Sequence, residues 1–149
     1  MINEASASRR IEDELEEHGT YATNTSGVSM MPLFKTHRDV VVLEAPCRKI
    51  KKYDVVLYTD SLDRYILHRV IGIKKDIYVI RGDNTFRKEL VPCERVIAYM
   101  ISFNRKGKHH TVDEAGYKLY SRLWHFIYPI RFLWHKFRAY CGKIKRALK

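Results

Sequence analysis

Ser26-Gly27-Val28-Ser29-Met30-Met31-Pro32 predicts a turn that presents a small hydroxyl, that of Ser29, to solvent or to a cleft. Gly27 can adopt a positive φ or let another chain approach closely. Pro32 prevents the chain from continuing as a helix or as a central strand. Glycine and serine are also ordinary turn residues, so the stretch by itself fits a plain turn as well as a nucleophile turn. Two later stretches favour the nucleophile.

His68 and Asp83 lie where an activated serine would need a base and a carboxylate. Taken singly, a structural histidine within a strand and an aspartate bonding its own turn are the commoner interpretations. Strands are expected at 64–73 and 77–81, and their short connection predicts a hairpin. The hairpin brings His68 and Asp83 into one neighbourhood. Since a hydroxyl nucleophile needs a base, and the base an orienting carboxylate, Ser29, His68 and Asp83 are the candidate catalytic residues.

Four motifs, in this order, resemble those of the type I signal peptidases, whose clan also holds the LexA-type self-cleaving repressors: Gly27-x-Ser29-Met30-x-Pro32, Tyr53-Asp54-Val55-Val56, His68-Arg69-Val70 and Gly82-Asp83-Asn84. The resemblance spans residues 26–101 and implies Ser29 as the nucleophile. His68 stands where the common bacterial enzymes have a lysine base, which is similar to the endoplasmic-reticulum, archaeal and sporulation-type branch. In that branch the position of Asp83 is a candidate third member. Glu89 and Asp54 are the other acids near in sequence.

The chain also departs from the family pattern. Gly27 stands where many members have a serine that helps to bind the oxyanion, so the hole would rely on backbone N–H groups, including that of Ser29. Met30, beside the nucleophile, is expected to contact the substrate. Tyr53 replaces the usual glycine. The 28 residues before Ser29 are mostly polar and offer neither a membrane span nor room for a DNA-binding module, which argues against an exported, membrane-tethered peptidase and against a repressor.

The rest of the sequence predicts a mostly antiparallel β domain with helical ends. An acidic helix is expected over 4–18, ended by Gly19. Short apolar runs separated by Asp, Gly and Pro, without helices between them, indicate an antiparallel sheet. We therefore expect a helix in 1–20, a signal-peptidase/LexA-like serine peptidase β domain in 21–110, and a basic amphipathic helical tail in 111–149. The expected strands are 21–25, 39–44, 53–59, 64–73, 77–81 and 94–103, with an exposed loop over 105–110.

The tail carries most of the net charge of +11. Residues 117–149 hold nine Lys/Arg and no Asp/Glu, whereas the rest of the chain has a balance of +2. Apolar residues recur there at helical spacing, and Pro129 is expected to kink or split the helix. An amphipathic basic helix with Trp and Tyr suits an anionic membrane surface. Packing on the β domain, self-association and binding of nucleic acid are the alternatives, and the acidic 4–18 helix is an available partner.

Composition restricts the compartment and the chemistry. Three cysteines without a CxxC pair indicate neither a disulfide framework nor a zinc site, and suit a reducing compartment. No secretory signal and no apolar run long enough to span a membrane is visible. We expect a cytoplasmic serine endopeptidase, at most peripheral on the inner face of the membrane, that cleaves a leader or precursor peptide without metal or cofactor. The alternative is a non-catalytic peptide-binding β domain anchored by its tail.

Overall fold

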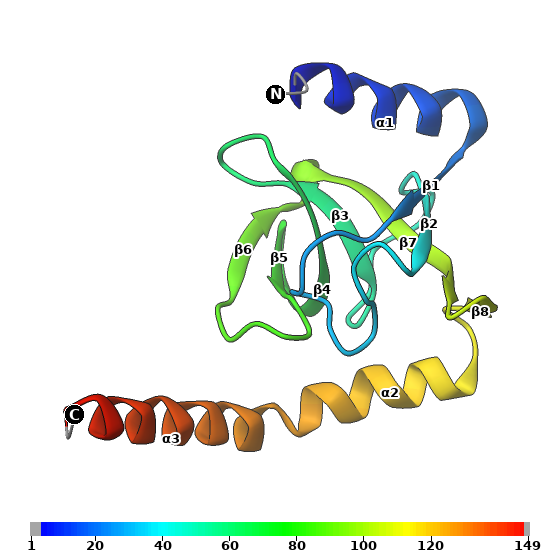
Figure 1. The fold of residues 1–149 in the computed structure, drawn as a ribbon. Helices are drawn as coiled ribbons and strands as arrows, with labels where there is room; N and C mark the ends of the chain where they lie inside the picture. The colour runs from blue at the N-terminus through cyan, green and yellow to red at the C-terminus, as the bar shows by residue number, and fades with distance from the viewer. Residues whose placement is uncertain (1–3, 148–149) are drawn as a thin grey trace.

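The computed structural model describes the backbone of residues 4–147 and the side chains of residues 11–141 (Figure 1). Helix α1 (Glu4–His18) ends at Gly19, which has φ 72° and donates its N–H to the carbonyl of Leu15, as the sequence predicts. Eight strands follow: β1 (Thr20–Asn24), β2 (Val40–Glu44), β3 (Val55–Thr59), β4 (Tyr65–Lys74), β5 (Ile77–Arg81), β6 (Glu89–Pro92), β7 (Val96–Arg105) and β8 (Lys108–Thr111).

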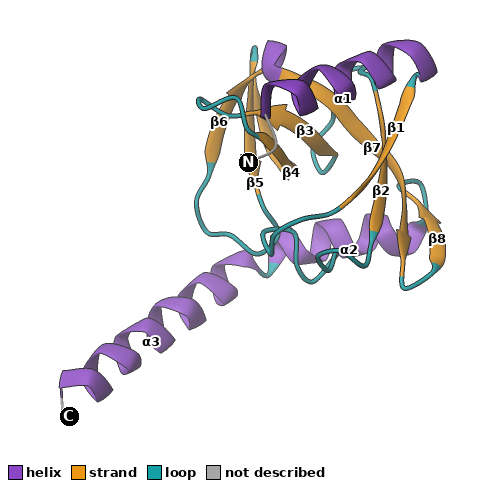
Figure 2. Ribbon diagram, turned by 45° about the horizontal axis from the view of Figure 1, so that its top comes forward, coloured by secondary structure: helices purple, strands orange, loops and turns teal. Residues whose placement is uncertain are grey.

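The strands form one antiparallel sheet in the order β1-β2-β7-β3-β4-β5-β6, with β8 paired to β7 (Figure 2). The prediction of a mostly antiparallel β fold is therefore confirmed. The predicted hairpin is present as β4 and β5, with Arg69 opposite Arg81. Strand β1 lies at one end of the order and pairs only with β2 among the described strands. Its outer edge therefore keeps unpaired backbone groups.

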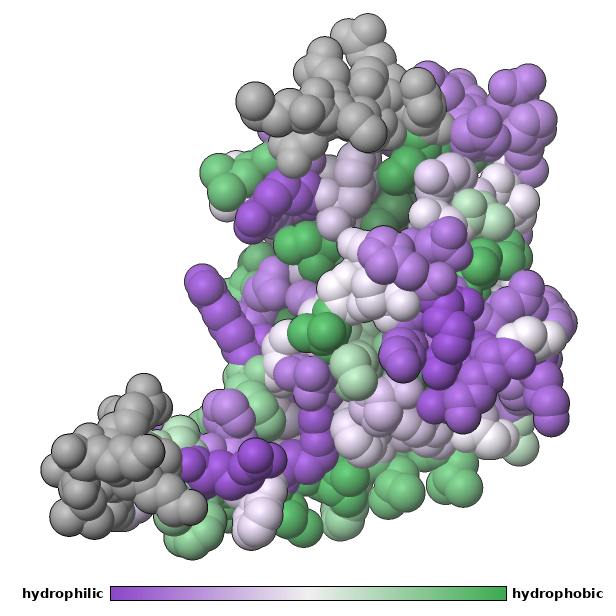
Figure 3. Space-filling view, viewed as in Figure 1, coloured by the Kyte–Doolittle hydropathy of each residue, from purple (hydrophilic) through white to green (hydrophobic). Residues whose placement is uncertain are grey.

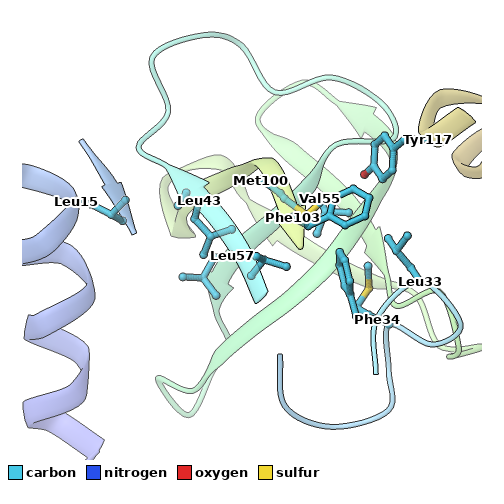
Figure 4. Close-up of a cluster of buried hydrophobic side chains, with 12 residues drawn as sticks. Leu15, Leu33, Phe34, Leu43, Val55, Leu57, Met100, Phe103 and Tyr117 are labelled. Carbon is cyan, nitrogen blue, oxygen red and sulfur yellow. The ribbon is translucent and has the colours of Figure 1, made fainter. Parts of the chain in front are cut away.

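The central strands read as continuous apolar runs because the sheet packs on both sides. Val55 and Leu57 of β3 belong to one buried cluster, and Val56 and Tyr58 belong to another. Side chains alternate along a strand, so both faces of β3 are covered. Figure 4 shows the first cluster, in which Leu15 of α1 points toward the sheet and the Phe103 ring lies between those of Phe34 and Tyr117.

Two strands were not predicted. Residues 105–110 were expected to be an exposed loop, but β7 and β8 form a hairpin there. Lys106 and Gly107 have φ 52° and 78°, as a two-residue turn of type I′ requires. The sequence did not predict strand β6 (Glu89–Pro92), because it is a short edge strand that begins with glutamate and ends with proline. A 3-10 turn, Cys93–Arg95, then leads into β7.

The C-terminal segment forms two helices, α2 (Ala115–Phe126) and α3 (Tyr128–Ala147). The predicted split lies at Ile127, just before Pro129. Helices α1 and α2 lie on opposite sides of the β domain, and α3 extends beyond it (Figures 1 and 2). Of the C-terminal segment, α2 and the first turn of α3 contribute to the site described next.

Candidate active site

The segment 25–39, which carries Ser29, is held closed at its base. The N–H of Thr25 donates to the carbonyl of Asp39, at 3.1 Å. The buried Asp39 carboxylate accepts bonds from the Arg38 side chain and from the N–H groups of Lys35 and Lys106. The bond from Arg38 is the main cause that lowers the pKa of Asp39 to about 2, with the two N–H groups assisting and burial opposing. Asp39 thus fixes both ends of the Ser29 segment.

The predicted turn residues take distinct places in this segment. Gly27 has φ 77°, a conformation that side chains disfavour, so glycine is required there. Ser29 is half-buried. Met30 is 5% exposed and packs in the first apolar cluster, so most of its side chain anchors the turn. It still lines the cavity beside Ser29, where the sequence predicted a substrate contact.

Gly82 brings the Ser29 turn and His68 together. A Cβ atom on Gly82 would lie 2.7 Å from the Ser29 carbonyl oxygen and 2.9 Å from His68 Nε2. Both atoms therefore occupy the space that a Cβ atom would need, so only glycine fits at this position. Asn84, two residues after Gly82, completes the contact, because its N–H donates to the Ser29 carbonyl (2.7 Å) and its side-chain amide donates to the carbonyl of Val28 (3.2 Å).

The other nitrogen of His68 faces Tyr58 and Glu89. The Tyr58 hydroxyl donates to Glu89 Oε2 at 2.6 Å, and its oxygen lies 3.3 Å from His68 Nδ1. Glu89 Oε1 lies 3.5 Å from the same nitrogen. Because the single phenolic proton is committed to Glu89, the Tyr58 oxygen can only accept from Nδ1–H. This assigns the Nδ1–H tautomer to the neutral ring and leaves Nε2, beside the Ser29 turn, as the acceptor.

Burial determines the protonation states of the His68 and Tyr58 side chains. It lowers the pKa of His68 below the ordinary 6.5, and the negative charges of Glu89 and Asp83 oppose the shift only in part. Burial, with the hydrogen bond to Glu89, raises the pKa of Tyr58, so the phenol stays protonated. At neutral pH the site therefore holds a neutral imidazole with a free Nε2 lone pair.

Asp83 does not bind the imidazole, contrary to the role expected from the sequence. Its carboxylate oxygens accept two bonds from Arg69, both at 2.8 Å, and one from the Tyr120 hydroxyl at 3.1 Å. The bidentate guanidinium geometry matches a carboxylate better than a single ring N–H does. The acid next to His68 is Glu89, on the unpredicted strand β6.

Helix α2 covers the ion pair between Arg69 and Asp83. Arg69 Nη1 donates to the Tyr117 hydroxyl (3.1 Å), to Ser121 Oγ (2.9 Å) and to a backbone carbonyl, that of Tyr53 (3.0 Å). Two further side chains, those of Trp124 and Arg131, donate to the Asp83 carbonyl at 2.8 and 2.9 Å. The sequence gives no sign of the contacts from α2 and α3, because they join residues 41 to 52 positions apart without any motif.

Tyr53 stands where the signal-peptidase pattern has a glycine, and it keeps the backbone conformation that favours glycine. Its φ is 80°, in the left-handed region that favours glycine. The residue is held there because its N–H donates to the Val70 carbonyl (2.8 Å) and its own carbonyl accepts from Arg69. Its ring packs edge-on to that of His125. The backbone at this position therefore has the conformation that a glycine would adopt without strain.

A cavity of about 500 Å³ opens in front of Ser29 and His68. Its walls come from α1, from β1 and from the first half of β4, through Ile11, Thr23, Asn24, Ile66 and Leu67. Pairing between β4 and β5 begins at Arg69, so residues 66–68 form a second edge facing the cavity. The hollow is thus bordered by two strand edges and reaches the candidate nucleophile and base.

No group of three or more His, Cys, Asp or Glu in the described part of the chain is arranged to hold a metal ion. Comparisons of the sequence with protein-family models and with curated proteins gave no match.

Proposed function

We propose that this chain is a serine endopeptidase of the signal-peptidase/LexA type, with Ser29 as nucleophile and His68 as general base. The observation that carries the proposal is the packing of Gly82 against both the Ser29 carbonyl and His68 Nε2, together with the open cavity that Ser29 and His68 line. The four ordered sequence motifs support the same family. Neither the packing at Gly82 nor the order of the motifs requires Asp83 to be the acid that orients His68.

The reaction would be acyl transfer to water. Ser29 Oγ attacks the scissile carbonyl while its proton passes to His68 Nε2, and the imidazolium then returns that proton to the leaving amine. Water next attacks the acyl-serine ester, with Nε2 again taking the proton, and releases the free acid and Ser29. During both steps Nδ1–H stays bonded to Tyr58, whose proton is held by Glu89. In this proposal Glu89 balances the imidazolium charge, and the Ser29 N–H, at the turn begun by Gly27, serves the oxyanion.

The substrate would be an extended peptide segment. The two strand edges that border the cavity can pair with an added strand, which is a common mode of peptide recognition. By resemblance to the family, small side chains would flank the cut. We propose a leader or precursor peptide in the cytoplasm, since Cys47, Cys93 and Cys141 are all free thiols.

The experiment that tests the enzyme class is covalent labelling with an acylating or phosphonylating serine probe. We expect one adduct, on Ser29, identified by mass spectrometry of the digested protein. Heat-unfolded protein is the control, because activation needs the folded His68. A folded protein that gives no adduct on Ser29 would favour the alternative, a non-catalytic peptide-binding domain.

The pH dependence should report a depressed histidine. Only neutral imidazole accepts the serine proton, so kcat/KM should rise with pH through one ionisation below 6.5 and be flat by about pH 7. The same shift affects stability, because between the two pKa values the unfolded state binds the extra proton. The free energy of unfolding should therefore fall as the pH drops below about 6.5. A rate that rises only near pH 10 would indicate a lysine base instead.

Glu89→Gln should slow cleavage about tenfold to a hundredfold, because the imidazolium loses its counter-charge. Since Glu89 raises the pKa of His68, the ionisation seen in kcat/KM should also move to lower pH. Tyr58→Phe should slow cleavage too, because it removes the acceptor of Nδ1–H. Glu94→Gln is the matched control, an exposed carboxylate two residues after Pro92. An unchanged profile in Glu89→Gln would exclude Glu89 from this role.

A further inference from the structure

Helices α2 and α3 expose a continuous apolar face on the side away from the β domain. Figure 3 shows this face as hydrophobic side chains along the lower edge of the molecule. Its members are each 53–78% exposed: Leu119, Leu123, Phe126, Ile130, Leu133, Trp134, Phe137 and Tyr140. Soluble monomers seldom leave an apolar patch of this extent uncovered. We call these eight residues the outer face.

The outer face is not the surface through which α2 packs on its own domain. That contact uses Tyr117, Ser121 and Trp124, which bond to Arg69 and Asp83. Leu119, Leu123 and Phe126 take no part in these bonds and are 53–78% exposed. Helix α2 therefore has two faces: one packs toward the Gly82–Asn84 turn, and the other is exposed to solvent.

A cluster of cations borders α2. A cavity of about 390 Å³ is lined by Lys118 and Arg122 of α2 and by Arg48, Lys51 and Lys52 of the connector before β3. Asp54 binds Arg48 (2.7 Å) and Asp113 binds Lys118 (2.9 Å). Lys51, Lys52 and Arg122 form no ion pair among the described residues. Positive charge from two distant parts of the sequence therefore converges beside the outer face.

Charge decides what can cover the outer face. Its three- and four-residue spacing would also suit a coiled coil with a second copy, but residues 117–149 contain nine Lys/Arg and no acid. Two such tails would repel each other along the seam. Nucleic acid would satisfy the cations and leave eight apolar side chains exposed. An anionic bilayer accommodates both the cations and the apolar side chains. Its head groups bind the cations, and the boundary of its acyl chains buries Leu, Phe and Trp.

We propose that the outer face of α2 and α3, with the cation cluster of Arg48, Lys51, Lys52, Lys118 and Arg122, binds the surface of an anionic phospholipid bilayer. No helix of the described residues is long and apolar enough to cross a membrane, so the helices lie along the interface. The Gly82–Asn84 turn then sits about one helix diameter, 10 Å, above the lipid. The proposal holds whether or not Ser29 is a nucleophile.

The test uses the full chain and vesicles of phosphatidylcholine, alone or mixed equally with phosphatidylglycerol. We expect co-sedimentation only with the mixed vesicles, and a loss of about tenfold or more in binding between about 0.05 and 1 M salt. The fluorescence of exposed Trp134 should shift to the blue on binding, and Trp134→Phe should remove most of that shift. Trp124, which is bonded to Asp83, should contribute little.

Two variants separate the two parts of the surface. One variant removes apolar contacts of the outer face: Leu123→Gln/Phe126→Gln/Ile130→Gln. The other removes cations that form no ion pair: Lys51→Gln/Lys52→Gln/Arg122→Gln. Each variant should weaken binding to mixed vesicles at least about tenfold. All six side chains are at the surface and Gln is a good helix former, so the thermal midpoint should stay unchanged. Leu62→Gln/Leu90→Gln, at exposed apolar sites on the β domain, is the matched control.

Three results would overturn the proposal. One is equal binding to both vesicle types. Another is a dimer in sedimentation velocity, without lipid, that the Leu123→Gln/Phe126→Gln/Ile130→Gln variant dissociates, because that result assigns the outer face to a second copy. The last is binding of duplex DNA or RNA at low salt with no binding to mixed vesicles.

Discussion

Ser29→Ala is expected to lower the rate of peptide cleavage by a factor of about 10³ or more, because in the proposed mechanism the Ser29 hydroxyl forms the acyl intermediate. The fold should persist, since the change removes one hydroxyl from a half-buried turn and should alter the free energy of unfolding by about 0.5 kcal/mol or less. The measurement is hydrolysis of a library of fluorogenic peptides, with circular dichroism as the check on folding.

Ser26→Ala is the matched control, since Ser26 lies in the same turn and lines the same cavity. It should retain near wild-type rates. His68→Ala should lose about as much activity as Ser29→Ala, and the double variant little more, because a nucleophile and its base act as one unit. Ser29→Ala protein that still hydrolyses the library at the wild-type rate would show that the assignment of the nucleophile is wrong.

Arg69→Met is expected to destabilise the protein by about 3–5 kcal/mol, the largest effect on stability that we predict. The substitution leaves the carboxylate of Asp83, only 3% exposed, with the Tyr120 hydroxyl as its side-chain partner. It also removes the donor that ties Tyr117 and Ser121 of α2 to β4. The measurement is urea unfolding, and the thermal midpoint should fall by roughly 10 °C.

The double variant Arg69→Met/Asp83→Leu distinguishes a buried charge from lost packing. Because it leaves no unpaired ion, it should be clearly more stable than Arg69→Met alone. Arg69→Lys should behave more like Arg69→Met, since an ammonium cannot make the paired bonds to both oxygens of Asp83. If the double variant were no more stable than the single one, the ion pair would not explain the loss.

The sequence predicts those parts of the fold that depend on local patterns. Short apolar runs reveal the central strands, and Gly19 and Pro129 mark where helices end. Strand β6 was not predicted because it has only four residues and ends in proline, and β8 was not predicted because its residues are polar. The strand character of both comes from pairing with their neighbours. Tertiary pairing overrides local propensity at such edges.

Within the site, sequence motifs identify the turns but not all of their partners. The Ser29 carbonyl and the His68 ring both lie against Gly82, which belongs to one of the motifs. Glu89, the acid next to His68, is named from the sequence only as an alternative to Asp83, because it belongs to none of the four motifs and its partner Tyr58 is 31 residues away. The bonds from Arg69 to α2 were missed for the same reason. Such contacts depend on register across the sheet, which a single sequence does not specify.

The way α2 closes over the Arg69–Asp83 pair also sets an order of events while the chain is being made. The Gly82–Asn84 turn leaves the ribosome well before Arg131, which lies 48 positions after Asp83 and donates to its carbonyl. At a translation rate of about 5–20 residues per second, that gap lasts roughly 2–10 s. During this delay Arg69 and Asp83 remain hydrated, and the turn that joins Ser29 to His68 lacks its cover. The nascent chain therefore emerges with the candidate site uncovered, and synthesis of α2 and of the first turn of α3 is the step that completes it.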